Sequence, residues 1–250
     1  MFVRPTNPTS HRLARLAFFT ACVAALLVGV SGPLHRYFGI DYGLAISLLR
    51  YGFYVAAAAM ALGLATIVPT RPGDRRRGFL SSLLALLIGI GAAWAPFSLF
   101  LNARGVPPIN DITTDVADPP RLVVTLQMRQ GATSPPAYGG TDVAVLQRAA
   151  YPDIMPIVLA VPPAEAFKRV DKVATAMGWE VVARAPAEGR IEAVDSTRWF
   201  GFRDDVVVRI RPDGTGSRID IRSKSRVGRS DLGVNARRIR AFTEKLKAEN

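Results

Sequence analysis

The sequence has few of the residues that most often carry out enzyme chemistry. Its 250 residues include one cysteine, Cys22, and two histidines, His11 and His35, and all three precede residue 103. The rest of the chain therefore cannot form an internal disulfide, and a transition-metal site there would have to use carboxylates alone. A serine hydrolase would have no histidine base, and the P-loop, dinucleotide-binding and G-x-S-x-G patterns are absent. We expect no metal and no cofactor.

Acidic residues are scarce in the first part of the chain, where apolar residues dominate. Residues 1–103 contain nine arginines and only two aspartates. They include three long apolar stretches, Leu13–Leu34, Tyr51–Val68 and Phe79–Leu101. About 20 apolar residues suffice for a helix to cross a hydrocarbon core about 30 Å thick. Each stretch is apolar around its whole circumference, unlike an amphipathic surface helix. The sequence therefore predicts a transmembrane region of three spans over residues 1–103.

The distribution of arginine predicts how these spans are oriented, because short cytoplasmic loops are enriched in basic residues. The loop between the first two spans contains only Arg36, which is offset by Asp41. The segment before the first span and the one between the second and third hold seven arginines: Arg4, Arg12, Arg15, Arg71, Arg75, Arg76 and Arg77. We therefore expect a multi-pass protein of the bacterial inner membrane, with a cytoplasmic N-terminus and a periplasmic C-terminal part.

The net charge of +12 suggests nucleic acid, but its distribution argues against that partner. Residues 104–250 contain 23 basic and 18 acidic residues, so more than half of the excess belongs to the membrane region. Nucleic-acid binding needs a basic surface that acids do not compensate. We expect no nucleic-acid partner. The expected partners are the membrane, an anionic lipid or other envelope ligand, and an envelope protein.

The remaining residues divide into a connector and a soluble domain. Repeated prolines predict a mostly extended connector over residues 104–153, with one short helix at Thr141–Ala150. Residues 154–250 have the pattern β-α-β-β-β-β-α. The two helices follow Pro162-Pro163 and Ser230-Asp231, and four strand-like segments lie between them: Trp179–Arg184, Arg190–Arg198, Asp205–Arg211 and Arg218–Arg226. We predict an α+β, helix-grip-like domain, in which an antiparallel sheet of four or five strands has both helices on one face.

Alternation along the last two strands separates charged from apolar side chains. Ile219, Ile221, Ser223 and Ser225 share one face of the last strand, and Asp220, Arg222, Lys224 and Arg226 share the other. This pattern favours a solvated charged face. Asp204 and Asp205 point to opposite faces, so they make a poor acid/base pair. We expect Asp205 to pair with Arg209 or Arg222. Asp204, Asp205, Arg209 and Asp220 are secondary site candidates.

The turn from the last strand into the last helix is the main candidate site. We predict that one connected polar cluster forms there from Arg222, Arg226, Arg229, Asp231 and Asn235. Arginine side chains and the N–H groups at a helix start suit phosphate or carboxylate. Alternatively, Asp231 caps its own helix and the cluster is structural.

Two segments resemble a known family: IEAVDSTRWFGFRDDVVVRI (Ile191–Ile210) and IDIRSKSRVGRSDLGVNARRI (Ile219–Ile239) are similar to the DUF1499 family, a domain of unknown function. The likeness covers roughly Asn110–Leu246, so the connector contains the start of the family domain. NDITTDVADPPR and AYPDI resemble the membrane-anchored form of the family. Many shorter members have Asn-Cys near the domain start, where this chain has Asn110 and Asp111. Because the family is a domain of unknown function, the resemblance implies a class of protein and no chemistry.

Two functions remain open from the sequence. The first is a non-enzymatic inner-membrane protein with a periplasmic binding or scaffolding domain. The alternative is an envelope enzyme that acts on a phosphorylated or glycan substrate through aspartates and arginines. The site residues favour the first, because no group of the second part is an evident nucleophile with its base.

Overall fold

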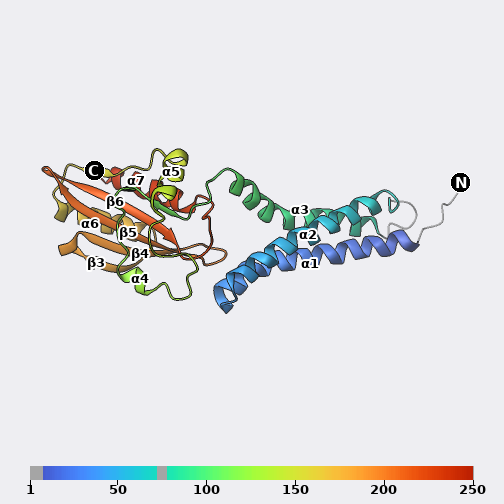
Figure 1. The fold of residues 1–250 in the computed structure, drawn as a ribbon. Helices are drawn as coiled ribbons and strands as arrows, with labels where there is room; N and C mark the ends of the chain where they lie inside the picture. The colour runs from blue at the N-terminus through green and yellow to red at the C-terminus, as the bar shows by residue number, and fades with distance from the viewer. Residues whose placement is uncertain (1–7, 72–77, 250) are drawn as a thin grey trace. The chain divides into compact units, whose positions relative to one another are not determined.

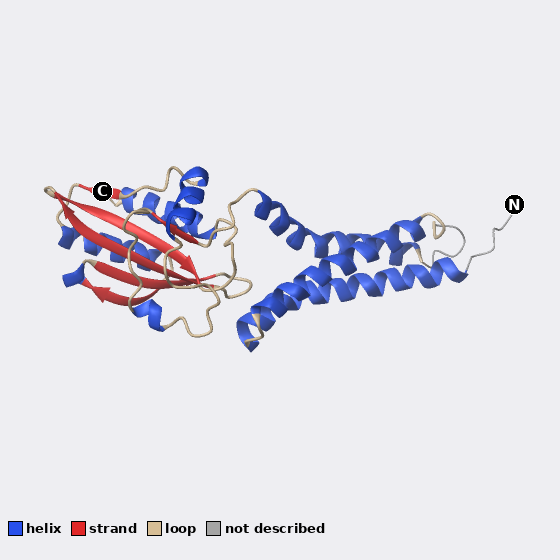
Figure 2. Ribbon diagram, in the orientation of Figure 1, coloured by secondary structure: helices blue, strands red, loops and turns tan. Residues whose placement is uncertain are grey.

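The computed structural model describes residues 8–71 and 78–249. The chain divides into two compact units, residues 1–101 and 102–250. Figure 1 shows the helical first unit and the mixed second unit, and Figure 2 shows where helix and strand occur along the chain.

Within the described residues, three helices are long and apolar enough to cross a membrane. They are α1 (Pro8–Phe38), α2 (Tyr42–Ile67) and α3 (Phe79–Arg104), as the sequence predicts. α2 begins nine residues before the predicted start, because Asp41 caps it by accepting the N–H of Leu44 at 3.1 Å. Small residues bring these helices together: Ala17, Ala21, Ala59 and Ala85 pack as one buried cluster. Arg4, Arg75, Arg76 and Arg77 lie outside the described residues.

The second unit is an antiparallel sheet with helices. Its sheet has the order β1-β6-β5-β4-β3, and β2 also pairs with β6. Its strands are β1 (Asp111–Thr113), β2 (Ile157–Leu159), β3 (Glu180–Ala185), β4 (Arg190–Ser196), β5 (Arg203–Asp213) and β6 (Gly216–Ser225). Its helices are α4 (Val124–Gln127), α5 (Gly140–Ala150), α6 (Pro163–Ala176) and α7 (Val234–Ala248), with a 3-10 turn, η1, at Pro186–Glu188.

The predicted element order is confirmed from β2 to α7, but the sheet has six strands where four or five were expected. The additional strand is β1, which comes from the proline-rich segment. Asp111 pairs with Lys224 and Thr113 pairs with Arg222 along the edge of β6. The sequence did not predict β1, because three residues are too few to show an alternation of apolar and polar side chains.

The helices α6 and α7 cover one face of the sheet, which we call the helix face. Most of its side chains are apolar and form the core of this unit. Phe242 of α7 is fully buried and its ring stacks on Trp179 at 5.5 Å. The sheet contributes Ile191, Ala193, Val206, Val208, Ile210, Ile219 and Ile221, and the helices contribute Val170, Val173, Ile239 and Leu246.

The opposite face of the sheet is not solvated, which corrects the sequence-based expectation. The side chains of Arg222, Lys224 and Arg226 are at most 8% exposed. Residues 114–138, which we call the strap, lie over this face (Figure 1). We call it the strap face. Alternation cannot distinguish a solvated face from one that a polar segment covers, because both present charged side chains at every second residue.

Candidate functional site

The strap face carries most of the charged residues singled out in the sequence. Asp205, Arg209, Arg222 and Arg226 contact charged and polar groups of residues 111–138. Asp220 lies on the same face and binds arginines that contact the strap. Four groups of contacts hold the strap, and each contains at least one carboxylate.

The first group joins β6 to β1. Arg222 binds Asp111 in a bidentate pair, with both N–O distances at 2.8 Å, and Lys224 Nζ lies 3.0 Å from the same carboxylate. Arg222 also donates to the carbonyl oxygens of Pro120 and Pro136. Burial lowers the pKa of Lys224, although the charge of Asp111 opposes this. Two cations therefore share one carboxylate, and strap carbonyls accept two further N–H groups of Arg222.

The aromatic ring beside this group is Tyr138, at the end of the strap. The guanidinium of Arg222 lies 5.7 Å from the centre of this ring. Burial, together with the negative charge of Asp111, raises the pKa of Tyr138 to about 12. The phenol therefore stays protonated throughout the physiological range and serves as a cover for Arg222.

The second group surrounds Asp205. Arg226 donates to Asp205 Oδ1 from Nε at 2.9 Å and from Nη2 at 2.6 Å, and Arg129 of the strap donates to Oδ2 at 2.5 Å. Arg226 also donates to the carbonyl of Met128. Asp205 was expected to pair with Arg209 or Arg222, and the structure shows Arg226 and Arg129 as its partners. Arg129 was missed because it lies far away in the sequence, in a segment without a readable pattern.

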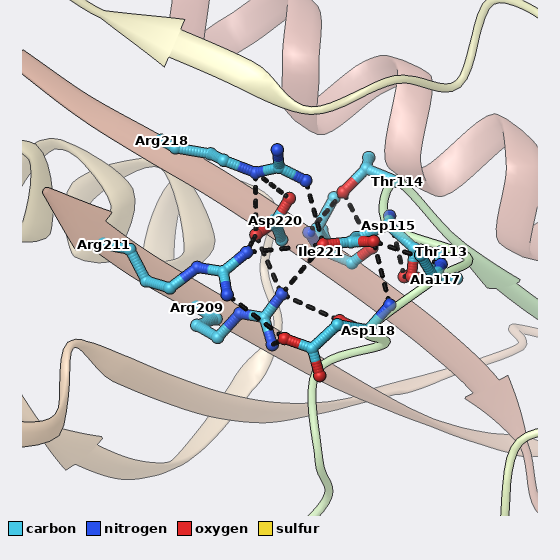
Figure 3. Close-up of polar contacts among 10 residues, drawn as sticks. All are labelled: Thr113, Thr114, Asp115, Ala117, Asp118, Arg209, Arg211, Arg218, Asp220 and Ile221. Carbon is cyan, nitrogen blue, oxygen red and sulfur yellow. Dashed lines mark hydrogen bonds and ion pairs between the residues drawn. The ribbon is translucent and has the colours of Figure 1, made fainter. Parts of the chain in front are cut away.

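The third group gathers three arginines and three aspartates (Figure 3). Asp220 is fully buried and accepts hydrogen bonds from Arg209, Arg211 and Arg218. The same arginines contact the strap through Asp115 and Asp118, with N–O distances of 2.9–3.3 Å. This group reaches solvent at Asp118, whose side chain is 62% exposed, and at Arg211 and Arg218.

The electrostatics of the third group favour the ionised form of Asp115. Burial opposes the ionisation of Asp115, but the backbone N–H groups of Asp118 and Ala117 and the charges of Arg218 and Arg209 together lower its pKa. Asp115 Oδ1 accepts those N–H groups at 3.0 and 3.2 Å. The carboxylate therefore shapes the strap locally and binds the sheet at the same time.

The fourth group anchors α4 to β4. Glu192 accepts the backbone N–H groups of Val123, Val124 and Thr125 at 2.9–3.1 Å, and the hydroxyl of Thr125 at 2.7 Å. Arg190 pairs with the same carboxylate. Burial opposes ionisation, but the hydrogen bonds from Thr125, Val124 and Val123 lower the pKa of Glu192. Buried Glu192 of β4 thus caps the N-terminus of α4 in the strap.

Polar residues on the helix face form a separate network around Asn235 and Arg238 of α7. Asn235 accepts from Ser223 Oγ at 2.7 Å and donates to Ser225 Oγ at 3.0 Å and to the carbonyl of Asn110 at 3.1 Å. Arg238 donates to Asp204 at 2.7 Å and to Asp195 at 2.8 Å. Asp204 and Asp205 therefore point to opposite faces and bind different arginines, as their alternation predicts.

Asp231 acts as a local cap. Its two carboxylate oxygens accept the N–H groups of Gly233 at 2.9 Å and Asn235 at 2.6 Å. Burial raises its pKa, against the effect of these hydrogen bonds. The geometry matches the structural alternative stated above, in which Asp231 caps the last helix.

The structure therefore divides the five residues of the main candidate site. Arg222 and Arg226 lie in different groups on the strap face, Asp231 and Asn235 lie on the helix side, and Arg229 is exposed in the loop between β6 and α7. Six of the partners were not predicted from the sequence: Asp111, Asp115, Asp118, Arg129, Glu192 and Arg238. The clustered aspartates of NDITTDVADPPR are a signal for Asp111, Asp115 and Asp118 only.

The arrangement is one of internally paired charges. Each carboxylate of the strap face is engaged by at least one guanidinium or ammonium group. In the ranges that the structure describes, no group of three or more His, Cys, Asp or Glu residues could hold a metal ion. Chemically, this face is suited to holding a covering segment in place, and only the third group offers charged atoms at the surface.

Together these features define a protein with three membrane-spanning candidate helices and an α+β domain whose sheet is covered by helices on one face and by a polar strap on the other. The model of the family described as "Protein of unknown function (DUF1499)" matches residues 111–246, more than half of the chain, so the chain belongs to this family. The match begins at β1 and includes the strap.

Other comparisons add little. No curated protein matches the chain. The crystal structure of TTHA0849 from Thermus thermophilus is similar to 38% of this chain and 96% of its own, with 14% sequence identity and a TM-score of 0.24. A similarity at this level carries no functional argument.

Proposed function

We propose that this protein is a non-catalytic binding or scaffolding protein of the bacterial inner membrane, which presents its DUF1499 domain in the periplasm. Three candidate spans and the arginine-rich segments before the first span and between the second and third support this orientation. An odd number of spans puts the two ends of the chain on opposite sides of the membrane.

The observation that carries the binding role is the pairing of the charges on the strap face. General acid/base chemistry needs a carboxylate with a shifted pKa that faces a substrate. Asp205, Asp220 and Glu192 are instead buried between the sheet and the strap, and each is held by arginine or by backbone N–H groups. A domain whose charges are paired internally is suited to presenting a binding surface. We expect its ligand to be an anionic envelope component or another envelope protein.

The orientation is tested by reporters that are active only in the periplasm. A fusion after Asn250 should be active and a fusion after Arg77 should be silent. The reverse pattern would put the domain in the cytoplasm and contradict the proposal.

The binding role is tested against the alternative, an envelope enzyme, at the only group of the strap face that reaches solvent among the described residues. Asp115→Asn and Asp118→Asn keep the shape of the side chains and remove their charge. If the protein is a scaffold, each folded variant should complement cells that lack it. A folded variant that fails to complement, with unchanged recovery of partners from detergent-solubilised membranes, would favour the enzyme.

A further inference from the structure

The connection between β4 and β5, residues 197–202, presents a tryptophan to solvent. Trp199 is 51% exposed, whereas Trp179 is buried in the core. The turn is well ordered by its own contacts: Thr197 N–H donates to the carbonyl of Phe202 at 2.9 Å, and the rings of Phe200 and Phe202 stack at 4.9 Å. Trp199 is therefore held outward by a built turn, which we call the tryptophan tip.

Basic residues surround the tryptophan tip. Arg203 is exposed at the start of β5, and Arg229 is exposed in the loop between β6 and α7. This loop lies beside the tip, because Arg226 N–H donates to the carbonyl of Arg203 at 3.0 Å. Residues 196–203 and 226–230 contain no aspartate or glutamate. This end of the sheet thus combines an exposed indole with positive charge.

The chain enters the second unit at this same end. Asn110 accepts the N–H of Ser225 at 2.9 Å and donates from its side chain to the carbonyl of Gly228 at 2.5 Å. Arg104, where α3 ends, is only six residues earlier. Six extended residues reach about 20 Å at most. The chain itself therefore limits how far the tryptophan tip can move from a bilayer that α3 crosses.

The opposite end of the sheet has a different character. The turn between β5 and β6 carries Asp213, and η1 carries Glu188. The β6 register puts this turn ten residues along the strand from the end beside Asn110. Acidic side chains therefore accompany the arginines at this end, and it lies farther along the chain from the membrane helix than the end beside Asn110.

We propose that the tryptophan tip docks on the bilayer that anchors the protein, with Trp199 in the headgroup region and with Arg203 and Arg229 on the phosphates of anionic phospholipids. Indole rings favour the membrane interface because one edge is apolar and the N–H can bind water or headgroups. Guanidinium groups bind phosphate in a bidentate manner. The inference rests on the membrane anchoring in the proposed function, but it is independent of which side of the membrane holds the domain.

The test uses the full chain in liposomes whose lipid tails carry bromine, which quenches nearby tryptophan. Trp94→Phe removes the tryptophan of α3 and leaves Trp179 and Trp199. In phosphatidylglycerol-containing liposomes, brominated lipid should quench the emission of this variant. The quenching should be lost in Trp94→Phe/Trp199→Phe, which keeps only the buried Trp179. Absence of quenching in Trp94→Phe would overturn the proposal.

A matched control moves the tryptophan to the other end of the sheet. Val158 of β2 is exposed and pairs with Arg218, near the β5–β6 turn. Val158→Trp in the Trp94→Phe/Trp199→Phe background should be unaffected by brominated lipid, and equal quenching there would also overturn the proposal.

The phosphate contacts are tested separately. Arg203→Ala/Arg229→Ala in the Trp94→Phe background should weaken the quenching of Trp199, and so should liposomes of pure phosphatidylcholine. Unchanged quenching in both cases would refute the phosphate contacts. None of these results depends on the reporter fusions, so the orientation can fail separately.

Discussion

The two faces of the β-sheet bury their residues by different means. The helix face excludes water with aliphatic and aromatic side chains from α6 and α7. The strap face buries charged groups beneath a segment that has little regular structure, and pairs them with one another. Apolar burial is non-directional and tolerates shifts, whereas each buried ion pair depends on the position of its partner. The comparison suggests that the helices supply stability and the strap face fixes one arrangement of the strap.

The largest loss of stability is expected on the helix face. Phe242→Ala removes a fully buried ring that stacks on Trp179, and it should lower the free energy of unfolding by about 4 kcal/mol. Guanidinium unfolding of the detergent-solubilised full chain can be followed by Trp179 emission in a Trp94→Phe/Trp199→Phe background. A loss below about 1 kcal/mol would show that this core is not the main source of stability.

A slightly smaller loss is expected when the strap face loses a central carboxylate. Asp205→Ala leaves Arg129 and Arg226 buried without their counter-charge, and it should cost about 3 kcal/mol. Both arginines keep carbonyl partners, which limits the loss. The same unfolding experiment measures it.

The control for Asp205→Ala removes the arginines as well. Asp205→Leu combined with Arg129→Met and Arg226→Met replaces the ion pairs by apolar groups, and it should recover most of the lost stability. If the triple variant is instead less stable than Asp205→Ala, the ion pairs themselves are a major source of stability and the comparison of the two faces fails.

A third effect depends on pH. Glu192→Gln weakens the anchor of α4 and should cost about 1–2 kcal/mol at pH 7. The pKa of Glu192 is lowered on folding, so its stabilisation is present above the ordinary glutamate pKa of about 4.3 and is lost as the pH falls through the lower, folded value. The difference in unfolding free energy between wild type and variant should therefore shrink in acid below about pH 4.

Asp231→Asn is the control, because its effect on stability should change with pH in the opposite direction to that of Glu192→Gln. The pKa of Asp231 is raised on folding, so its contribution is largest below the ordinary aspartate pKa and decreases as the pH rises through the folded value. The wild type should therefore gain stability relative to Asp231→Asn as the pH falls through the folded value. Identical pH profiles for the two variants would contradict the assignment of the two carboxylates.

The sequence predicted the helix face well because its information is local. Val206, Val208 and Ile210 alternate along β5, and α7 has a continuous apolar stripe, so the strands, helices and their buried sides could be read from short windows. The alternation in β6 also predicted which charged residues share a face. The three membrane helices were predicted for the same reason, since length and composition decide them.

The strap was not predicted because its contacts are distant in sequence and polar. Asp111 and Arg222 are 111 residues apart, and Arg129 and Asp205 are 76 apart. No periodic pattern links such pairs, and a paired charge has the same sequence signature as a solvated one. The predicted cluster at the start of the last helix included Arg222 and Asp231 for their spacing. Arg222 points to the strap face of β6, whereas Asp231 lies in the turn after β6 and accepts N–H groups at the start of α7.

The smallest effect is expected at the surface of the third group, and it sharpens the comparison within one cluster. Asp118 is 62% exposed and contacts Arg209 and Arg211, which both keep Asp115 and Asp220 as partners. Asp118→Ala should therefore change the free energy of unfolding by less than about 1 kcal/mol, and added salt should reduce the difference further.

Asp220→Ala is the matched buried variant. It removes a carboxylate that three arginines share, and should cost at least about 3 kcal/mol. If the two variants lose equal stability, burial does not determine the strength of these ion pairs, and the strap would be held as firmly by its exposed edge as by its buried contacts.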